Sequence, residues 1–167
     1  MSDAKRPDKA EHTDKTVRVF TTHSSEETIL LGRELAKLLV PPKVLVLRGD
    51  LGAGKTTLVK GIAAALGAAE PEEVTSPTFT LIHEYAGRSV EHDSLGNTVL
   101  LYHIDLYRIE GQRQLDTLGM EDLMTPQSLI LIEWGEKFPS ITERSDGEIV
   151  LETLPGDERR ITLRLGS

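Results

Sequence analysis

The chain has 167 residues, 38% of them apolar, which suits a single domain with a hydrophobic core. It contains no cysteine, which excludes disulfides and thiolate metal sites and favours a cytoplasmic location. Its 19 basic and 27 acidic residues give a net charge of −8, so we expect no strong direct binding of nucleic acid.

The N-terminal segment is expected to lie outside the folded domain. Residues 1–16 are polar, mixed in charge and without the apolar stretch of a signal peptide, so we predict a disordered tail there. Residues 17–167 are predicted to form a single P-loop ATPase domain. No run in the chain is long and apolar enough to cross a membrane, so we expect no membrane association.

The first elements of this domain are a strand and a helix. Residues 17–20 alternate weakly and predict the strand. Ser24 and Glu27 have the spacing of a capping box, in which the serine caps the helix and the glutamate reaches back. Leucines follow at helical spacing, at Leu31, Leu35, Leu38 and Leu39. The pair Pro41-Pro42 is expected to end this helix.

A strand, a glycine-rich loop and a helix come next. Residues 44–47 form a short, continuous apolar run, which is typical of a strand buried on both faces. The glycine-rich segment follows it directly. Leu58, Ile62 and Leu66 then recur every four residues, and Gly67 is the expected stop of the helix.

The middle of the chain is predicted to be mainly extended. Residues 75–85 are typical of an extended segment interrupted at Pro77, and residues 86–97 of a polar surface loop. Residues 99–104 form a second apolar run of the buried-strand kind.

The last part of the chain is predicted to end in a hairpin. Residues 112–124 favour one or two short helices, and residues 128–132 a third buried strand. Residues 148–154 and 160–165 flank a Pro-Gly-Asp turn signal. The whole pattern predicts an α/β fold: a P-loop NTPase-like three-layer sandwich with a mixed, partly parallel sheet and a C-terminal β-hairpin.

The glycine-rich segment matches the phosphate-loop pattern G-x-x-x-x-G-K-[ST]. Gly49 and Gly54 are expected to adopt backbone angles closed to other residues, so that N–H groups point at phosphate oxygens, with help from Gly52. Lys55 would contact the β- and γ-phosphates, and the Thr56 hydroxyl would bind Mg²⁺. The guanine-binding pattern N-K-x-D is absent, which favours ATP as substrate. We predict ATP binding by Gly49, Asp50, Leu51, Gly52, Ala53, Gly54, Lys55, Thr56 and Thr57.

Two acids end buried strands, where a phosphate loop needs a carboxylate for the metal and its waters. Glu133 follows residues 129–132, and Asp105 follows residues 99–104. We favour Glu133 together with Thr56 as the Mg²⁺ ligands, with Asp105 orienting water or supporting the site from further away. Either acid is alternatively a helix cap or a salt-bridge partner. His103 lies near Asp105, but the five histidines show no metal-ligand spacing, and we expect them to be solvated or packed.

Two further segments are candidates for sensing the nucleotide. Ser76 and Thr78 flank Pro77 and have hydroxyls suited to a switch segment that detects the γ-phosphate. The alternative is a proline-kinked entry to a strand. Trp134, the only tryptophan, either anchors the core or packs near the nucleotide.

These segments together resemble the TsaE family, also called YjeE. The resemblance is carried by residues 49–57 (GDLGAGKTT), 76–79 (SPTF), 103–108 (HIDLYR) and the pair Glu133-Trp134. Their order and spacing both fit, and the resemblance covers the chain from about residue 17 to its C-terminus. The tail and the loop at residues 87–97 look longer than the family minimum.

The resemblance implies an ATPase required for the threonylcarbamoyl modification of adenosine 37 in certain tRNAs. It implies TsaD and TsaB as protein partners, with tRNA reached indirectly through them. It also points, weakly at the level of single residues, to residues 22–27 and 156–160 as further parts of the nucleotide pocket.

Catalysis in this interpretation rests on Lys55, Asp105 and Glu133. Slow turnover by the isolated chain is expected, because the sequence shows no obvious arginine finger. Arg108 is the only motif arginine available for that role. A partner would then supply or order the missing group.

Two other functions remain open. One is a small-molecule kinase on the same loop, although the chain is short for a second substrate site and the loop at residues 87–97 offers a single arginine, Arg88. The other is a non-catalytic, ATP-dependent switch module that controls the assembly of a partner complex.

Overall fold

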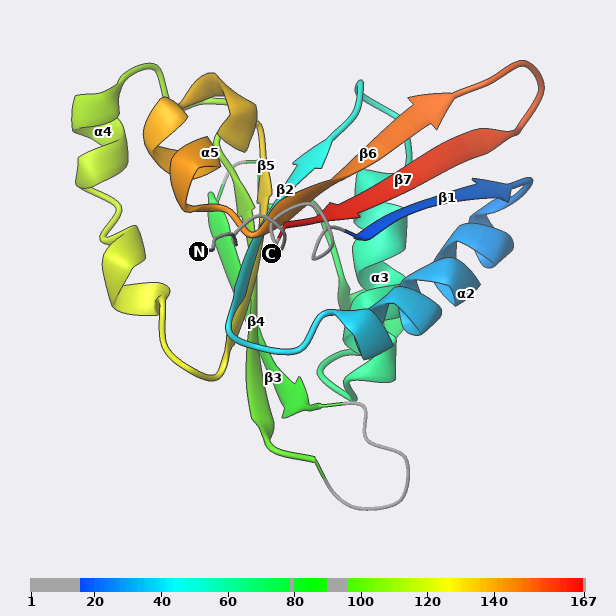
Figure 1. The fold of residues 1–167 in the computed structure, drawn as a ribbon, viewed down its shortest axis with the longest axis horizontal. Helices are drawn as coiled ribbons and strands as arrows, with labels where there is room; N and C mark the ends of the chain where they lie inside the picture. Colours follow the sequence, from blue (N-terminus) through cyan, green and yellow to red (C-terminus); the bar gives the residue numbers. More distant parts are fainter. Residues whose placement is uncertain (1–15, 79, 90–95, 167) are drawn as a thin grey trace, which may run out of the picture.

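The computed structural model describes residues 16–78, 80–89 and 96–166. Thr16, included in the predicted disordered tail, is instead the first residue of a strand, and the rest of that tail lies outside the described residues. Seven strands form one sheet in the order β1-β7-β6-β2-β5-β4-β3 (Figure 1). The strands are β1 (Thr16–Thr22), β2 (Lys43–Arg48), β3 (Ile82–Arg88), β4 (Thr98–Asp105), β5 (Ser128–Glu133), β6 (Gly147–Thr153) and β7 (Arg159–Leu165).

The sheet is parallel at its centre and antiparallel toward both edges. β2 pairs parallel with β5 and β6, and β4 pairs parallel with β5. The pairs β1–β7, β6–β7 and β3–β4 are antiparallel. Every residue of β5 is buried, as expected for a central strand covered on both faces. The predicted mixed sheet and C-terminal hairpin are therefore confirmed.

Helices cover both faces of the sheet and complete the predicted three layers. α2 (Ser25–Leu35) and α3 (Lys55–Ala65) lie on one face, and α4 (Gln112–Asp116) and α5 (Pro139–Arg144) on the other (Figure 1). Short 3-10 turns occupy Ala36–Leu38, Pro71–Glu73, Met120–Leu123 and Gly135–Lys137. Each face has its own cluster of buried apolar side chains. No helix in the described part of the chain has the length and apolarity needed to cross a membrane.

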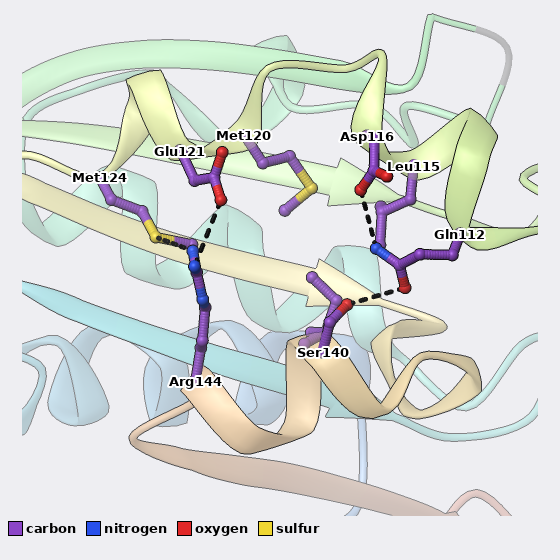
Figure 2. A pocket seen from close by; sticks show the side chains of 9 residues that line it. Gln112, Leu115, Asp116, Met120, Glu121, Met124, Ser140 and Arg144 are labelled. Atoms are coloured by element: carbon purple, nitrogen blue, oxygen red, sulfur yellow. Dashed lines mark hydrogen bonds and ion pairs between the residues drawn. The ribbon is translucent and has the colours of Figure 1, made fainter.

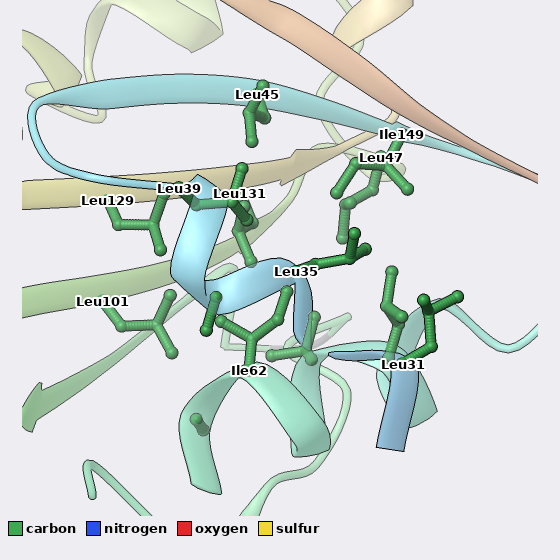
Figure 3. Packing of buried hydrophobic residues seen from close by; sticks show 14 of the residues in the cluster. Leu31, Leu35, Leu39, Leu45, Leu47, Ile62, Leu101, Leu129, Leu131 and Ile149 are labelled. Atoms are coloured by element: carbon green, nitrogen blue, oxygen red, sulfur yellow. The ribbon is translucent and has the colours of Figure 1, made fainter. Parts of the chain in front are cut away.

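The leucine-rich core lies between α2, α3 and the sheet. Figure 3 shows Leu31 and Leu35 of α2 and Ile62 of α3 facing leucines of the central strands. The two helices approach closely because they meet at glycines. A Cβ on Gly61 would lie 2.0 Å from the carbonyl oxygen of Ile29, and a Cβ on Gly32 would lie 2.4 Å from that of Leu58. This contact brings the N-terminus of α2 beside the phosphate loop.

The start of α2 follows the predicted cap in part. The Ser24 hydroxyl accepts a hydrogen bond from the backbone N–H of Glu27 at 3.1 Å. The Glu27 carboxylate reaches back one residue further than predicted, because it accepts from the backbone N–H of His23 at 2.7 Å. His23 Nδ1 also lies 3.1 Å from this carboxylate, so the histidine side chain favours the longer reach.

Two local predictions were wrong. Residues 86–88, predicted to begin a loop, are the end of β3 and pair with β4, and Gly87 is needed there because a Cβ would lie 2.4 Å from the Leu66 carbonyl oxygen. The segment predicted to be extended over residues 75–85 is interrupted at Pro77, as predicted, but by a turn in which the Leu81 N–H donates to the Pro77 carbonyl oxygen at 2.6 Å. The strand begins only at Ile82. Helix α5 had no counterpart among the predicted elements, because its six residues are too few to show a helical period.

Candidate functional site

The phosphate loop and both predicted acids meet at one edge of the sheet. The loop leaves the end of β2, while Asp105 ends β4 and Glu133 ends β5. Asp105 and Glu133 are register partners on neighbouring parallel strands, and Glu133 is also opposite Leu47 of β2. The carboxyl ends of parallel strands form the usual ligand-binding edge of such sheets. A cavity of about 670 Å³ opens at this edge, lined by Asp50, Leu51, Gly52, Gly54, Lys55, Thr56, Thr57, Ser76, Thr78, Asp105, Tyr107, Glu133 and Trp134.

The glycines of the loop serve two different purposes. Gly52 (φ 82°) and Gly54 (φ 105°) adopt left-handed backbone conformations, and Gly54 is the residue from which α3 begins. Gly49, predicted to need unusual backbone angles, is not among the left-handed residues. It is required for space, since a Cβ there would lie 2.8 Å from the carbonyl oxygen of Leu151 in β6. Glycine is thus required at the start of the loop by the close approach of β6 and at its end by left-handed backbone angles.

Lys55 lies at the centre of the site and is 7% exposed. Its ammonium donates to the Gly49 carbonyl oxygen at 2.6 Å and lies 3.6 Å from Glu133 Oε1. It also lies 5.1 Å from the ring centroid of Trp134. A buried ammonium is tolerated only with such compensating partners, so these contacts fix the position of Lys55 at the cavity.

The two acids are held by different partners. Glu133, 4% exposed, accepts a hydrogen bond from His103 Nε2 at 2.6 Å as well as pairing with Lys55. Asp105, 3% exposed, accepts from the Thr78 hydroxyl at 2.8 Å and from the Tyr107 backbone N–H at 2.9 Å. Each carboxylate is therefore oriented by protein donors, and Glu133 also lies beside the Lys55 ammonium.

The Ser76–Thr78 segment connects to the site through hydroxyl groups. Ser76 Oγ lies 2.8 Å from Thr78 Oγ1, which in turn donates to Asp105. Phe79 lies outside the described residues. The hydroxyl pair and the carboxylate thus form one hydrogen-bonded chain along the wall of the cavity, a suitable position for a sensing role.

Trp134 was expected either to anchor the core or to pack near the nucleotide site, and its position fits both. It packs against the apolar cluster under α4 and α5, and it lines the cavity. Its ring centroid is 5.3 Å from that of Tyr107, a cavity-lining residue of the 103–108 motif to which the sequence analysis gave no role. Lys137 holds the adjacent turn by donating to the carbonyl oxygens of Leu106, Tyr107 and Ile109. Arg108 lies in this turn, is exposed and is not one of the residues that line the cavity.

Comparison with known proteins decides the family. The family model described as "Threonylcarbamoyl adenosine biosynthesis protein TsaE" matches residues 22–161. This chain belongs to the TsaE family.

Individual members of the TsaE family are similar over most of the chain. The tRNA threonylcarbamoyladenosine biosynthesis protein TsaE of Treponema pallidum is 36% identical over 142 residues, covering 85% of this chain and 96% of that protein. The protein of the same name from Bacillus subtilis is 38% identical over 143 residues, covering 86% and 82%. The crystal structure of Bacillus subtilis YdiB superposes with a TM-score of 0.62 at 33% identity, covering 92% of this chain and 88% of that one.

A second cavity adjoins the phosphate loop in this TsaE family member. Its volume is about 390 Å³, and it is lined by His23, Ser24, Ser25, Thr28, Gly52, Gly54, Thr57, Asp157 and Arg159. It shares Gly52, Gly54 and Thr57 with the first cavity. Residues from the stretches 22–27 and 156–160, which the resemblance indicated only weakly, therefore meet at the loop although they are far apart in the sequence.

His23 joins the two walls of this second cavity. Its ring lies 3.1 Å from the Glu27 carboxylate of α2 and 3.2 Å from that of Glu158 in the β6–β7 hairpin. The hydrogen bond with Glu27, together with the charges of both carboxylates, raises the pKa of His23 above its ordinary value. Arg159 of the same hairpin donates to the Gly52 carbonyl oxygen at 3.4 Å. The hairpin thus closes onto both α2 and the loop.

Proposed function

We propose that this chain is the ATP-binding and ATP-hydrolysing subunit of tRNA threonylcarbamoyladenosine biosynthesis. The observation that carries the proposal is the meeting of a phosphate loop, its lysine and two buried carboxylates around one cavity. Membership of the TsaE family supplies the pathway.

The donor atoms at this edge fit Mg²⁺ as the cofactor. The described residues contain no cluster of three or more His, Cys, Asp or Glu side chains placed to hold a metal by themselves. Mg²⁺ does not need one, because it keeps several waters and binds through one or two protein oxygens and the substrate phosphates. Thr56 and Glu133 both line the cavity and would hold it, with Asp105 nearby. When bound, Mg²⁺ would neutralise charge on the phosphate oxygens.

The protein groups divide the remaining work. Lys55 stabilises the negative charge on the phosphoryl group that is transferred, and the loop N–H groups of residues 49–57 bind the phosphate oxygens. Asp105 or Glu133 orients the attacking water, since both are held by protein donors at the cavity wall. Ser76 and Thr78 detect the γ-phosphate through their link to Asp105. The second cavity receives the nucleoside, since it adjoins the loop and shares Gly52, Gly54 and Thr57 with the first cavity.

Turnover by the chain alone is expected to be slow. Within the described chain, no arginine lines the cavity that holds Lys55 and both acids. An arginine finger is worth a large part of the rate in related NTPases. We propose that TsaD and TsaB, acting in the cytoplasm, supply or order such a group, for instance by moving Arg108. The net charge of −8 supports contact with tRNA through these proteins rather than directly.

The test measures ATP hydrolysis by the purified chain in three mixtures: alone, with the TsaB–TsaD pair, and with the pair plus tRNA. The Lys55→Ala chain provides the background in each mixture. Strong stimulation by the pair, absent with Lys55→Ala, is the expected result.

Two other results would redirect the proposal. Partner-independent turnover, together with phosphoryl transfer to an added small-molecule acceptor, would identify a kinase instead. Full tRNA modification by a Glu133→Ala chain that binds ATP but does not hydrolyse it would identify a switch module.

A further inference from the structure

His103 is the one fully buried histidine in the described part of the chain, and it touches the candidate metal ligand. Its exposed fraction is 0%, and its Nε2 lies 2.6 Å from Glu133 Oε2. Sequence reasoning expected a packed or solvated side chain. The side chain is packed, and it is also the first of three interacting groups: His103 contacts Glu133, whose other carboxylate oxygen, Oε1, lies 3.6 Å from the Lys55 ammonium.

The spacing of the segment explains how the contact arises. Side chains alternate along a strand, so His103 and Asp105 project from the same face of β4. Asp105 is the register partner of Glu133, and His103 is the partner of Leu131, two residues earlier on β5. His103 is therefore the diagonal neighbour of Glu133, one step further from the cavity. The H-x-D spacing places a donor behind the carboxylates.

The hydrogen bonding of the ring indicates which atom carries its proton. His103 Nδ1 is buried and has no hydrogen-bond partner within the described residues. A doubly protonated ring would leave a charged N–H without an acceptor there, which is costly in the interior. Lys55 already provides a positive charge for Glu133. The neutral ring with its proton on Nε2 satisfies both conditions, so His103 donates and Glu133 accepts.

We propose that His103 is a positioning residue for Glu133. By holding Oε2 from behind, it fixes the carboxylate so that Oε1 faces Lys55 and the phosphate loop before nucleotide arrives. Partners that orient metal-binding side chains in this way affect metal affinity and activity by about 10- to 100-fold. The inference rests on the proposed function, because that function gives Glu133 its role.

Four variants separate this role from simple packing. His103→Leu keeps an apolar side chain of moderate size and removes the donor. His103→Gln and His103→Asn both carry an amide, but only the longer Gln places its N–H₂ near the position of Nε2. The matched control is His83→Leu. His83 is the cross-strand partner of His103 on β3, and its ring bonds Thr80 and Tyr85 rather than Glu133.

Two quantities are measured on each folded variant. One is the kcat of ATP hydrolysis in the presence of the stimulating partners, with the KM for ATP. The other is the Mg²⁺ concentration needed for half-maximal binding of a non-hydrolysable ATP analogue, determined by calorimetry. Thermal unfolding identifies variants that do not fold.

We expect His103→Leu and His103→Asn to lower kcat by about 10-fold or more and to raise the Mg²⁺ requirement, with little change in the KM for ATP. His103→Gln and His83→Leu should stay close to the parent chain. In a Glu133→Gln background, His103→Leu should have almost no further effect, because a residue that acts through Glu133 has nothing left to orient.

The inference is overturned if His103→Leu keeps the parental kcat and Mg²⁺ requirement, or if its effect is undiminished in the Glu133→Gln background. Should His103→Leu not fold, the Gln and Asn variants decide: equal losses overturn the positioning role, and a loss confined to Asn supports it. A parent chain with no hydrolysis in any mixture would instead refute the proposed function.

Discussion

Two hollows, one at the carboxyl edge of the sheet and one beside α4 and α5, differ in how their polar groups are used. The cavity at the phosphate loop contains Lys55, Glu133 and Asp105, all less than 10% exposed, with their charged atoms turned toward a common space. The groove between α4 and α5, about 330 Å³, is lined by polar groups that bond one another (Figure 2). Gln112 donates to Asp116 and accepts from Ser140, and Arg144 pairs with Glu121.

The difference indicates that the cavity at the phosphate loop, with its buried charges, is the better candidate for catalysis. In the groove, the pairs lie at the surface and satisfy one another over an apolar floor that includes Leu115 and Met120. At the phosphate loop, burial raises the free-energy cost of each charge. We expect the charges of a bound ligand to offset part of this cost. Substitutions in the two regions should therefore have unequal effects.

The largest effect is expected from Lys55→Ala. The change removes the ammonium that would contact the phosphates and leaves Glu133 without its cationic partner. The kcat/KM of ATP hydrolysis should fall by about 100-fold or more, the scale seen when one transition-state donor is lost. Enzyme assays and calorimetric titration with ATP measure it. Unchanged affinity together with unchanged turnover would mean that the cavity is not the nucleotide site.

Gly61→Ala should lower both the stability of the fold and the affinity for ATP, because it disturbs the packing of α3 against α2. The new Cβ would meet backbone atoms of α2, so the helices must separate, at a cost of about 1–3 kcal/mol in the free energy of unfolding. ATP affinity should also fall, because the N-terminus of α2 lines the second cavity. The control is Gly111→Ala, where no atom lies within 4 Å of the new Cβ. Equal destabilisation of both variants in chemical denaturation would show that the helix contact is not the cause.

Arg144→Ala tests the groove and should have a small effect. Its ion pair with Glu121 spans 3.2 Å, and the two side chains are 53% and 76% exposed. Exposed pairs of this kind contribute less than about 1 kcal/mol to stability. ATP affinity and turnover should be those of the parent chain. A loss of turnover comparable to that of Lys55→Ala would remove the distinction between the two hollows.

The smallest effect is expected from pH acting on His23. The folded pKa of His23 is raised above its ordinary value of 6.5. Its contribution to folding stability is therefore complete below pH 6.5 and is lost as the pH rises through the raised pKa. The pKa of Glu27 is lowered from 4.5, chiefly by the His23 backbone N–H, so its contribution is complete above pH 4.5 and is lost as the pH falls through the lowered pKa. The link between α2 and the hairpin is therefore strongest between pH 4.5 and pH 6.5.

Thermal unfolding of the parent chain and of His23→Gln over about pH 5 to 9 measures this dependence. The parent should lose a little stability on the alkaline side, and His23→Gln should not. If the variant loses as much as the parent, another group is responsible.

Local sequence rules identified much of the fold and part of the site. The apolar runs of β2, β4 and β5 correctly predicted strands buried on both faces, because the side chains of such strands are apolar on both faces and do not alternate with polar ones. The phosphate-loop pattern identified the turn into α3, because left-handed angles at Gly52 and Gly54 require glycine. Positions at the ends of two of these strands were enough to single out Asp105 and Glu133.

Other features depend on partners distant in sequence. The strand character of residues 86–88 comes from pairing with β4, and the need for glycine at position 49 comes from the β6 backbone. The contact of His103 with Glu133 depends on β4 lying beside β5 in one register, and the second cavity on the β6–β7 hairpin reaching α2. Periodicity, caps and turn chemistry act over a few residues, so the sequence by itself determined most of the elements and the phosphate loop, but not α5 or the end of β3. Sheet order and register act across the chain, so only the tertiary structure decided which side chains share the site.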